Sequence, residues 1–176
     1  RNKVKDYFKK PEVLSYMVDE PARLIDASDS FFKLFNIPLE EKKTYLMKFY
    51  HQIIFDRSLG VRNYLDDSAF HKVVFNTFCR TYSEMYFMEG DPIYEEFLAI
   101  INNDLEISQV WEEAKKAKDD VTFRANEERA VFFNFKGLRI KTIYSVEPLW
   151  GNHRFVLLHY DTPNPLIKLF KKTGII

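Results

Sequence analysis

The sequence has 176 residues, enough for one domain with a substantial core, and 46% of them are apolar and 30% charged. Its 26 basic and 26 acidic residues cancel, which argues against a domain that grips nucleic acid itself, since such domains carry a basic excess. No apolar run is long enough to span a membrane, and a single cysteine, Cys79, excludes an internal disulfide and suits a reducing, cytoplasmic compartment.

The first stretch of the chain predicts helices around one short strand. Residues 1–10, RNKVKDYFKK, are basic and typical of the end of a linker. A helix is predicted to begin at Pro11, because apolar residues at 13, 14, 17 and 18 share one helical face, and to end at Pro21. Residues 22–25 predict a short strand. Ser28 or Asp29 then caps a short helix that ends before residue 38.

The middle of the chain predicts four longer helices. Apolar residues at three-and-four spacing predict the first over 39–55, and a segment containing Gly60 ends it. The second begins near residue 66 or 67 and runs to about Met88 with apolar residues around most of its circumference, which indicates burial on more than one side. Asp91 and Pro92 supply a cap and a first-turn proline for the third helix, 93–101, and the fourth covers 107–118.

The last part of the chain predicts an antiparallel meander of four strands, 121–126, 129–135, 138–146 and 153–161, with turns at Glu127-Glu128, Lys136-Gly137 and Gly151-Asn152. Alternation assigns the inner face to Val121, Phe123, Ala125, Val131, Phe133, Phe135, Leu138, Ile140, Thr142 and Tyr144. One buried face requires a covering layer, which the preceding helices can provide. The predicted fold class is therefore α+β, with an antiparallel β-sheet covered by a layer of helices in one domain.

This element order resembles a PAS domain. Within it, Cys79-Arg80, Asp91-Pro92, Trp111, Gly137 and the segment 160–163 are similar to the MmyB-like ligand-binding domain of helix-turn-helix (XRE-type) regulators. In that family a Leu-Arg pair ends one helix, an acidic-Pro step opens the next and a Trp closes the last. The resemblance covers residues 11–163. Cys79 stands where Leu is usual, and Ile107 stands where an aromatic residue is common.

The resemblance implies the sensor domain of a bacterial transcriptional regulator, with a fatty-acid-like or other hydrophobic ligand between helices and sheet. It also implies a homodimer, and contact with DNA only through an upstream helix-turn-helix domain, to which residues 1–10 would be the linker. The basic opening and the missing initial Met agree with such a domain. Residues 164–176 form a C-terminal tail with a short basic amphipathic segment, which we expect to dock on its own domain or on a partner chain.

The sequence offers little support for catalysis. It contains no HExxH, CxxC or GxSxG motif and no glycine-rich phosphate loop. Of the histidines, His51 and His71 are predicted to be solvated, and His159 either bonds a ligand head group or has a structural role. Cys79 lies among aromatic residues and is predicted to be an inert core thiol. We therefore expect a protein that is not an enzyme and needs no metal or cofactor.

The surplus of aromatic residues carries the functional hypothesis, because 17 Phe and 10 Tyr make 16% of the chain aromatic. Large flat rings can line a cavity, and a ligand pocket is apolar with a few polar groups. The candidate ligand-binding residues come from two helices and the strands, and are Phe75, Phe78, Arg80, Tyr82, Tyr86, Trp111, Phe123, Phe133, Ile140, Thr142, Tyr144 and His159. Arg80 is the candidate residue to bind the carboxylate head group of a ligand, since a planar guanidinium can form two parallel hydrogen bonds with a carboxylate.

Two alternatives stay open at the level of sequence. The first is a PAS-like dimerisation module whose core is filled and binds no ligand. The second is an enzyme built like a steroid isomerase, which would require a buried carboxylate or histidine facing a cavity.

Overall fold

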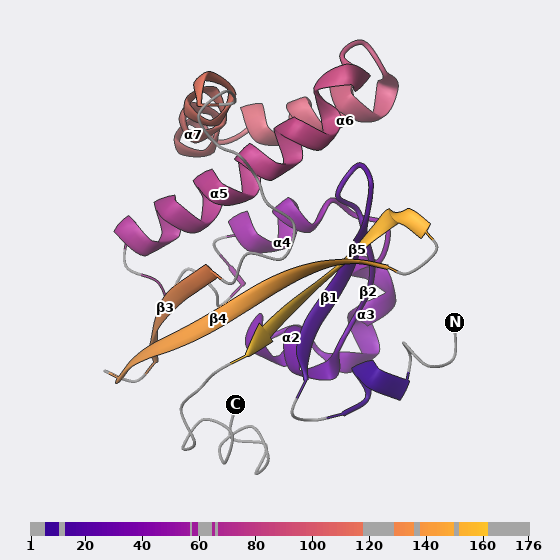
Figure 1. Ribbon diagram of the computed structural model, residues 1–176, viewed down its shortest axis with the longest axis vertical. Coiled ribbons are helices and arrows are strands. Elements are labelled where there is room, and N and C mark those ends of the chain that lie inside the picture. Colours follow the sequence, from indigo (N-terminus) through magenta and orange to yellow (C-terminus); the bar gives the residue numbers. More distant parts are fainter. Residues whose placement is uncertain are drawn as a thin grey trace.

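The computed structural model describes residues 6–10, 13–56, 58–59, 65, 67–117, 129–135, 138–149 and 152–161 (Figure 1). Pro11, the predicted strand 121–126 with Phe123, the turns at Glu127-Glu128 and Lys136-Gly137, and the tail 164–176 lie outside these residues.

The described strands form one antiparallel sheet of five strands in the order β2-β1-β5-β4-β3. Three of them, β3 (Arg129–Phe135), β4 (Leu138–Leu149) and β5 (Asn152–Asp161), confirm the predicted meander. The other two are β1 (Leu14–Asp19) and β2 (Leu24–Ala27). The sheet therefore joins both ends of the described chain, with β1 and β5 paired near its centre.

The helix predicted to begin at Pro11 is wrong, because residues 14–19 form β1. Five of the six residues of this strand are buried, and it has neighbours on both edges. Leu14, Tyr16 and Val18 alternate with Ser15, Met17 and Asp19, so the strand has a period of two, but it is only six residues long and Leu14, Met17 and Val18 also fit a helical spacing. The apolar residues at 14, 17 and 18 matched a helical face by coincidence.

The helix predicted over 39–55 is also wrong as a single element. It divides into a 3₁₀ turn η1 (Leu39–Glu41), α3 (Lys42–Tyr45) and α4 (Tyr50–Phe55). Between them the chain runs beside β2: Met47 N–H donates to Leu24 O at 2.7 Å, and Leu24 N–H donates to Lys48 O at 2.8 Å. α3 ends at Tyr45 because Leu46 is extended, with ψ 143°, and Met47 then adopts φ 68°, in the left-handed region. Backbone bonding to a strand edge therefore replaces helical bonds here.

The remaining helices agree with the sequence. They are α2 (Asp29–Leu34), α5 (Asp67–Met85) with the 3₁₀ turn η3 (Tyr86–Met88), α6 (Pro92–Asn102) and α7 (Leu105–Lys116). Ser28 caps α2 and Asp91 caps α6, where Pro92 takes the first position. Ser28 Oγ is fully buried and accepts from two backbone N–H groups, those of Ser15 at 3.1 Å and Phe31 at 3.3 Å.

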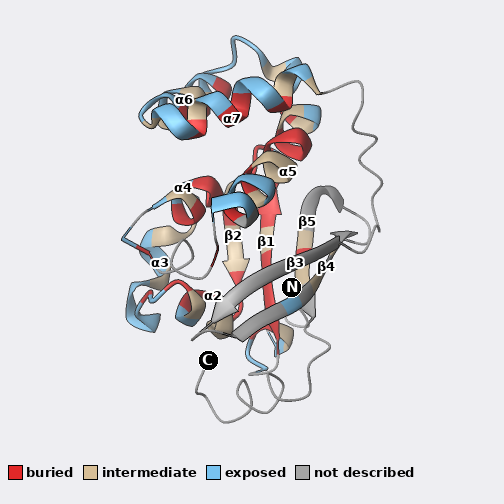
Figure 2. Cartoon of the chain, turned by 90° about the vertical axis from the view of Figure 1, so that its left-hand side faces the viewer, coloured by how far each residue is buried: buried red, intermediate tan, exposed pale blue. Residues whose placement is uncertain are grey.

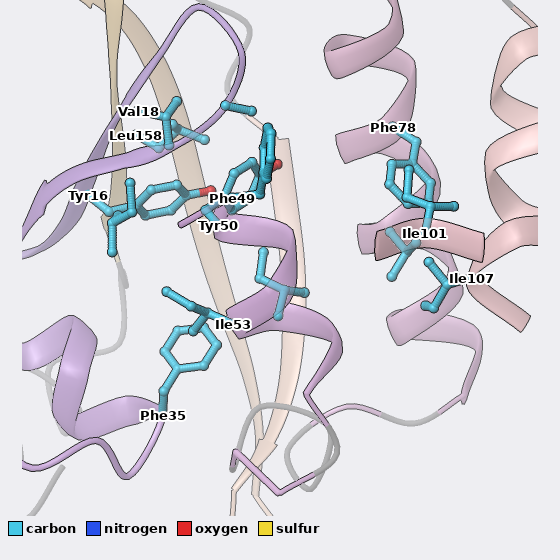
Figure 3. Packing of buried hydrophobic residues seen from close by; sticks show 14 of the residues in the cluster. Tyr16, Val18, Phe35, Phe49, Tyr50, Ile53, Phe78, Ile101, Ile107 and Leu158 are labelled. Carbon is cyan, nitrogen blue, oxygen red and sulfur yellow. The ribbon is translucent and has the colours of Figure 1, made fainter. Parts of the chain in front are cut away.

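The helices lie in two tiers over the sheet, as Figures 1 and 2 show. Helix α4 lies between α5 and the β1–β2 part of the sheet, and α6 and α7 cover α5 on its other side. Ring contacts connect the sheet to the helices next to it: Tyr16 of β1 lies 5.0 Å from Phe31 of α2 and 5.4 Å from Tyr50 of α4, centroid to centroid. Figure 3 shows this part of the core beside the cluster around Phe78.

Strand register identifies the face of the sheet that the helices cover. Tyr16 pairs with Leu158, both are buried, and the Tyr16 ring contacts α2 and α4. Because β4 pairs with β5 through Tyr144 opposite Tyr160, positions 140, 142 and 144 lie on the same face as Tyr16. Position 133 pairs with 140 and shares that face. The positions of the predicted inner face that belong to β3 and β4 therefore lie on the helix-covered face, and those in 121–126 lie outside the described residues.

Candidate functional site

A buried polar cluster lies between α4 and α5. We define it as Tyr50 and His51 of α4 together with Arg80, Thr81 and Glu84 of α5. The first four are at most 2% exposed. Positions 80, 81 and 84 share one side of α5, since residues three and four apart on a helix are neighbours. Polar side chains gathered in an apolar interior are a feature of binding sites.

His51 is held as a neutral imidazole in this cluster. Its Nε2 lies 3.1 Å from Thr81 Oγ1, and its ring contacts those of Tyr50 at 4.2 Å and Phe97 at 4.9 Å. Burial, and secondly the charge of Arg80, hold the pKa of His51 well below its usual range. Its Nδ1 is buried and has no hydrogen-bond partner among the described residues. The prediction that His51 is solvated is therefore wrong, because α4 faces α5 rather than solvent.

Arg80 is 2% exposed and lies against the Tyr50 side chain. Its Nη2 donates to the Tyr50 hydroxyl at 3.3 Å, and the guanidinium carbon lies 5.6 Å from the centroid of the Tyr50 ring. Its Nε lies 4.0 Å from Glu84 Oε2, a long ion pair. The pKa of Glu84 is raised, because burial outweighs the opposing effect of Arg80, and Glu20 raises it further. Arg80 therefore places a buried cation beside a phenol at the junction of the helices and the sheet.

Aromatic rings form the wall of the cluster toward α6 and α7. Phe78 meets Trp111 edge to face at 5.1 Å, and Phe97 meets Trp111 at 5.2 Å. Phe78 also stacks on His51 at 5.5 Å. Tyr82 also meets Trp111 edge to face, at 5.5 Å. Trp111 is 1% exposed, and its Nε1 has no hydrogen-bond partner within the described part of the chain.

Of the predicted ligand-binding residues, Phe78, Tyr82 and Trp111 are in ring contact, whereas Arg80 lies on another side of α5 and contacts Tyr50. Phe75 is half-buried beside His71, and Tyr86 is 46% exposed. The backbone positions of Phe133, Ile140, Thr142 and Tyr144 lie on the helix-covered face of the sheet. Phe123 lies outside the described residues.

His159 lies on the opposite face of the sheet and is a correction to the predicted set. In β5 it follows Leu158, which is on the helix-covered face, so it points the other way. Its Nδ1 lies 2.8 Å from the Tyr7 hydroxyl and 2.7 Å from Ser15 Oγ. These contacts tie the segment before β1 to the outer face of the sheet and give His159 a structural role.

Thr81 and Glu84 of the cluster were not among the predicted site residues, and three further residues of the site were missed by sequence reasoning. Tyr50 and His51 were placed in one long helix with no partner, and Phe97 was not singled out in α6. All three are buried. Their apolar spacing with Ile53 and Ile101 was a signal for burial, but only the contact between α4 and α5 shows what they face.

The cluster can recognise an anion and an apolar group, but it offers no metal site. Among the described residues, no group of three His, Cys, Asp or Glu side chains could hold a metal ion. Cys79 is buried, as an inert core thiol would be, and His71 is exposed and contacts Glu113 at 3.0 Å. None of the helices within the described ranges is long and apolar enough to cross a membrane.

The described elements define an α+β protein with one antiparallel sheet covered by helices. No protein-family model matches the sequence, and no curated protein matches it significantly. Among solved structures, the chain is similar to the PAS domain of an HTR-like protein from Haloarcula marismortui, with 8% identity, a TM-score of 0.39 and coverage of 92% of this chain and 95% of that one. It is also similar to the PAS domain of BvgS from Bordetella pertussis, with 11% identity, a TM-score of 0.40 and coverage of 99% and 96%. Similarity this low carries no argument about function, and the fold class rests on the described elements themselves.

Proposed function

We propose that this chain is a PAS-like sensor domain that binds a hydrophobic carboxylic acid, such as a fatty acid, between its helices and its sheet. The observation that carries the proposal is the Arg80 guanidinium, buried with the Tyr50 hydroxyl where α4 and α5 meet the sheet. In its fuller form, residues 11–163 are the ligand-binding domain of an MmyB-like bacterial transcriptional regulator in the cytoplasm. DNA contact then belongs to another domain, and the sensor pairs as a homodimer.

The chemistry of the cluster supports an acidic head group. A guanidinium and a phenol both donate hydrogen bonds, and a guanidinium can engage a carboxylate with two parallel bonds. Glu84 is a carboxylate beside Arg80, and its long 4.0 Å ion pair and raised pKa describe a weak interaction. A ligand carboxylate would displace Glu84 from Arg80 at little cost.

The surroundings of the cluster support an apolar body for the ligand. Rings from three helices, Phe78, Phe97 and Trp111, lie beside the polar groups, and the sheet contributes its helix-covered face. A ligand that separates α4 from α5 would shift both helices relative to the sheet. Such a shift is how binding in this interior would change a neighbouring domain.

Lipid extraction of the denatured, purified protein and thermal shift test this proposal. We expect a fatty acid to co-purify, and tetradecanoate to raise the melting temperature more than tetradecanol does. In Arg80→Gln, tetradecanoate should raise the melting temperature no more than tetradecanol does. In Glu84→Gln, the difference between the two rises should be larger than in wild type. Lys116→Gln, which removes an exposed charge from α7, is the matched control and should behave as wild type. If Arg80→Gln does not fold, Tyr50→Phe replaces it in this test, because it deletes only the hydroxyl, and it should reduce the difference between the two ligands.

The alternative is a PAS-like dimerisation module with a filled core. The direct contacts among Phe78, Phe97 and Trp111 favour it, because they leave these rings satisfied without a ligand. Absence of co-purifying lipid, no thermal response to either probe and a stable dimer by light scattering would establish the alternative and end the ligand proposal.

A further inference from the structure

One imidazole nitrogen on the outer face of the sheet faces two hydroxyl groups. His159 Nδ1 lies 2.8 Å from the Tyr7 hydroxyl and 2.7 Å from Ser15 Oγ. A ring nitrogen of a neutral imidazole carries either one proton or one lone pair, so it makes one strong hydrogen bond at a time. Tyr7 and Ser15 therefore compete for His159, and the arrangement has two states. We define these three residues as the histidine junction.

The histidine junction holds segment 6–10 against the sheet. Tyr7 and Phe8 lie in one short turn of helix, Phe8 is buried, and the rings of Tyr7 and His159 lie 6.1 Å apart. Ser15, in contrast, belongs to β1, which is paired with a neighbouring strand on each edge. Because a paired strand is held more firmly than a single turn, a disturbance of the junction is relieved on the Tyr7 side.

A continuous series of contacts joins this junction to the buried cluster around Arg80. Arg80 Nη2 donates to the Tyr50 hydroxyl at 3.3 Å, and the Tyr50 ring lies 5.4 Å from that of Tyr16, beside it in Figure 3. Tyr16 and Ser15 are consecutive residues of β1 and point to opposite faces of the sheet. The residue opposite Ser15 in β5 is His159 itself. A displacement of the Tyr16 side chain therefore moves the backbone that carries Ser15.

We propose that the histidine junction couples segment 6–10 to the Arg80 cluster, so that a ligand bound at the cluster releases the segment from the sheet. The ligand in this statement rests on the proposed function, whereas the coupling rests on the contacts alone. Helix α4 lies between α5 and the β1–β2 part of the sheet (Figures 1 and 2), so a ligand that separates α4 from α5 moves α4 toward β1. Tyr50 then displaces Tyr16, and the shift of β1 favours the hydrogen bond within the sheet over the one to segment 6–10.

Trypsin cleavage after Lys9, followed by mass spectrometry on the full chain, measures this release. Lys9 is exposed, but segment 6–10 must leave the sheet before a protease can bind it as an extended chain. Cleavage after Lys116, an exposed residue of α7, reports any general change in the same sample. We expect tetradecanoate to raise the ratio of the Lys9 rate to the Lys116 rate about fivefold, the factor that corresponds to the loss of one hydrogen bond.

Two variants fix the junction in one state or the other. Tyr7→Phe deletes the hydroxyl that holds the segment, so it should show the raised ratio without ligand and no further rise with it. Ser15→Ala deletes the competing hydroxyl, so it should keep the low ratio even when tetradecanoate raises its melting temperature. Tyr45→Phe deletes the hydroxyl of a half-buried tyrosine in α3, is the matched control and should behave as wild type.

The outcomes separate this proposal from the proposed function. A rise in melting temperature with tetradecanoate and an unchanged cleavage ratio would overturn the coupling and leave the ligand proposal standing. If tetradecanoate has no thermal effect, the ligand proposal ends, and Tyr50→Leu tests the coupling without ligand by removing the ring that packs on Tyr16. We expect Tyr50→Leu to raise the ratio in the wild-type background and to add nothing in Tyr7→Phe. Effects of the two substitutions that simply multiply would refute the coupling.

Discussion

His51 should make the stability of this protein depend on pH in the direction set by a buried neutral imidazole. The folded state holds the pKa of His51 well below its usual range, through burial and then the charge of Arg80, whereas the unfolded chain binds a proton near the ordinary value. Between the two pKa values the unfolded state binds more protons than the folded state. Stability is therefore highest above the unfolded pKa and falls as the pH drops below it.

The size of this effect follows from linkage. For an unfolded pKa of about 6.5, lowering the pH from about 7.5 to about 5.5 should cost about 1.4 kcal/mol of unfolding free energy through His51 alone. Glu84 acts in the opposite direction. Its pKa is raised in the folded state, so at pH values above the pKa of the unfolded chain the folded state binds more protons than the unfolded state. Its contribution grows as the pH falls toward the ordinary carboxyl range, so the whole protein should show less than the full His51 loss.

The variant His51→Gln isolates the contribution of the imidazole. Its amide can still bond Thr81, which His51 Nε2 contacts at 3.1 Å, but it does not titrate. Urea unfolding followed by circular dichroism at the two pH values should give a difference between wild type and variant that shrinks by about 1.4 kcal/mol at the lower pH. His71→Gln, at an exposed position, is the control and should keep the wild-type pH dependence. A His51→Gln protein with unchanged pH dependence would refute the assignment of a neutral buried His51.

Three further predictions concern stability and are checked by chemical denaturation. Ser28→Ala should cost about 2–3 kcal/mol, because two buried backbone N–H groups lose their shared acceptor, and a loss under about 0.5 kcal/mol would contradict the capping geometry. Phe78→Ala should cost about 3–5 kcal/mol, whereas Phe87→Ala, at 63% exposure, should stay within about 0.5 kcal/mol; similar losses would mean that the two environments are misassigned. Met47→Val should destabilise the protein by about 1–2 kcal/mol, since a β-branched residue is strained at φ 68°, and Met47→Gly should not; the reverse order would remove the strain argument.

The elements that the sequence predicted correctly are those specified by neighbouring residues. Helix α6 has its cap and proline at Asp91 and Pro92, and α2 has Ser28. The strands β3 to β5 alternate or are bounded by turn residues. In each case the signal lies within a few positions of the element, so periodicity and capping chemistry suffice.

The elements that failed are specified by distant contacts. β1 is only six residues long, and its apolar residues fit a helical spacing as well as an alternation, so its pairing with β5, far along the chain, decides its structure. The break before α4 depends on backbone bonds from Met47 and Lys48 to Leu24, more than one element away. Neither cause is visible in a local window of sequence.

The residues of the candidate site fall into the same two groups, those specified by local sequence and those specified by distant contacts. The burial of Phe78 and Trp111 could be predicted because they stand in periodic helices, and Arg80 was singled out by the resemblance and by its guanidinium. Their role in binding a ligand stays a prediction. His51 was missed because its burial requires α4 to face Thr81 and Phe78 of α5. His159 was misplaced because the face it occupies depends on the register between β1 and β5.

That register also governs when the fold can be completed during synthesis. Leu14 pairs with Tyr160, so the strand made first waits for the strand made last, while helices and the strands β2, β3 and β4 emerge between them. Contacts so distant in sequence slow folding and leave intermediates exposed. A chain cut short before Asn152 would hold one hairpin of β1 and β2 and another of β3 and β4, with no strand to join them. The open edge of β1 would then be available to any other extended chain in the cell.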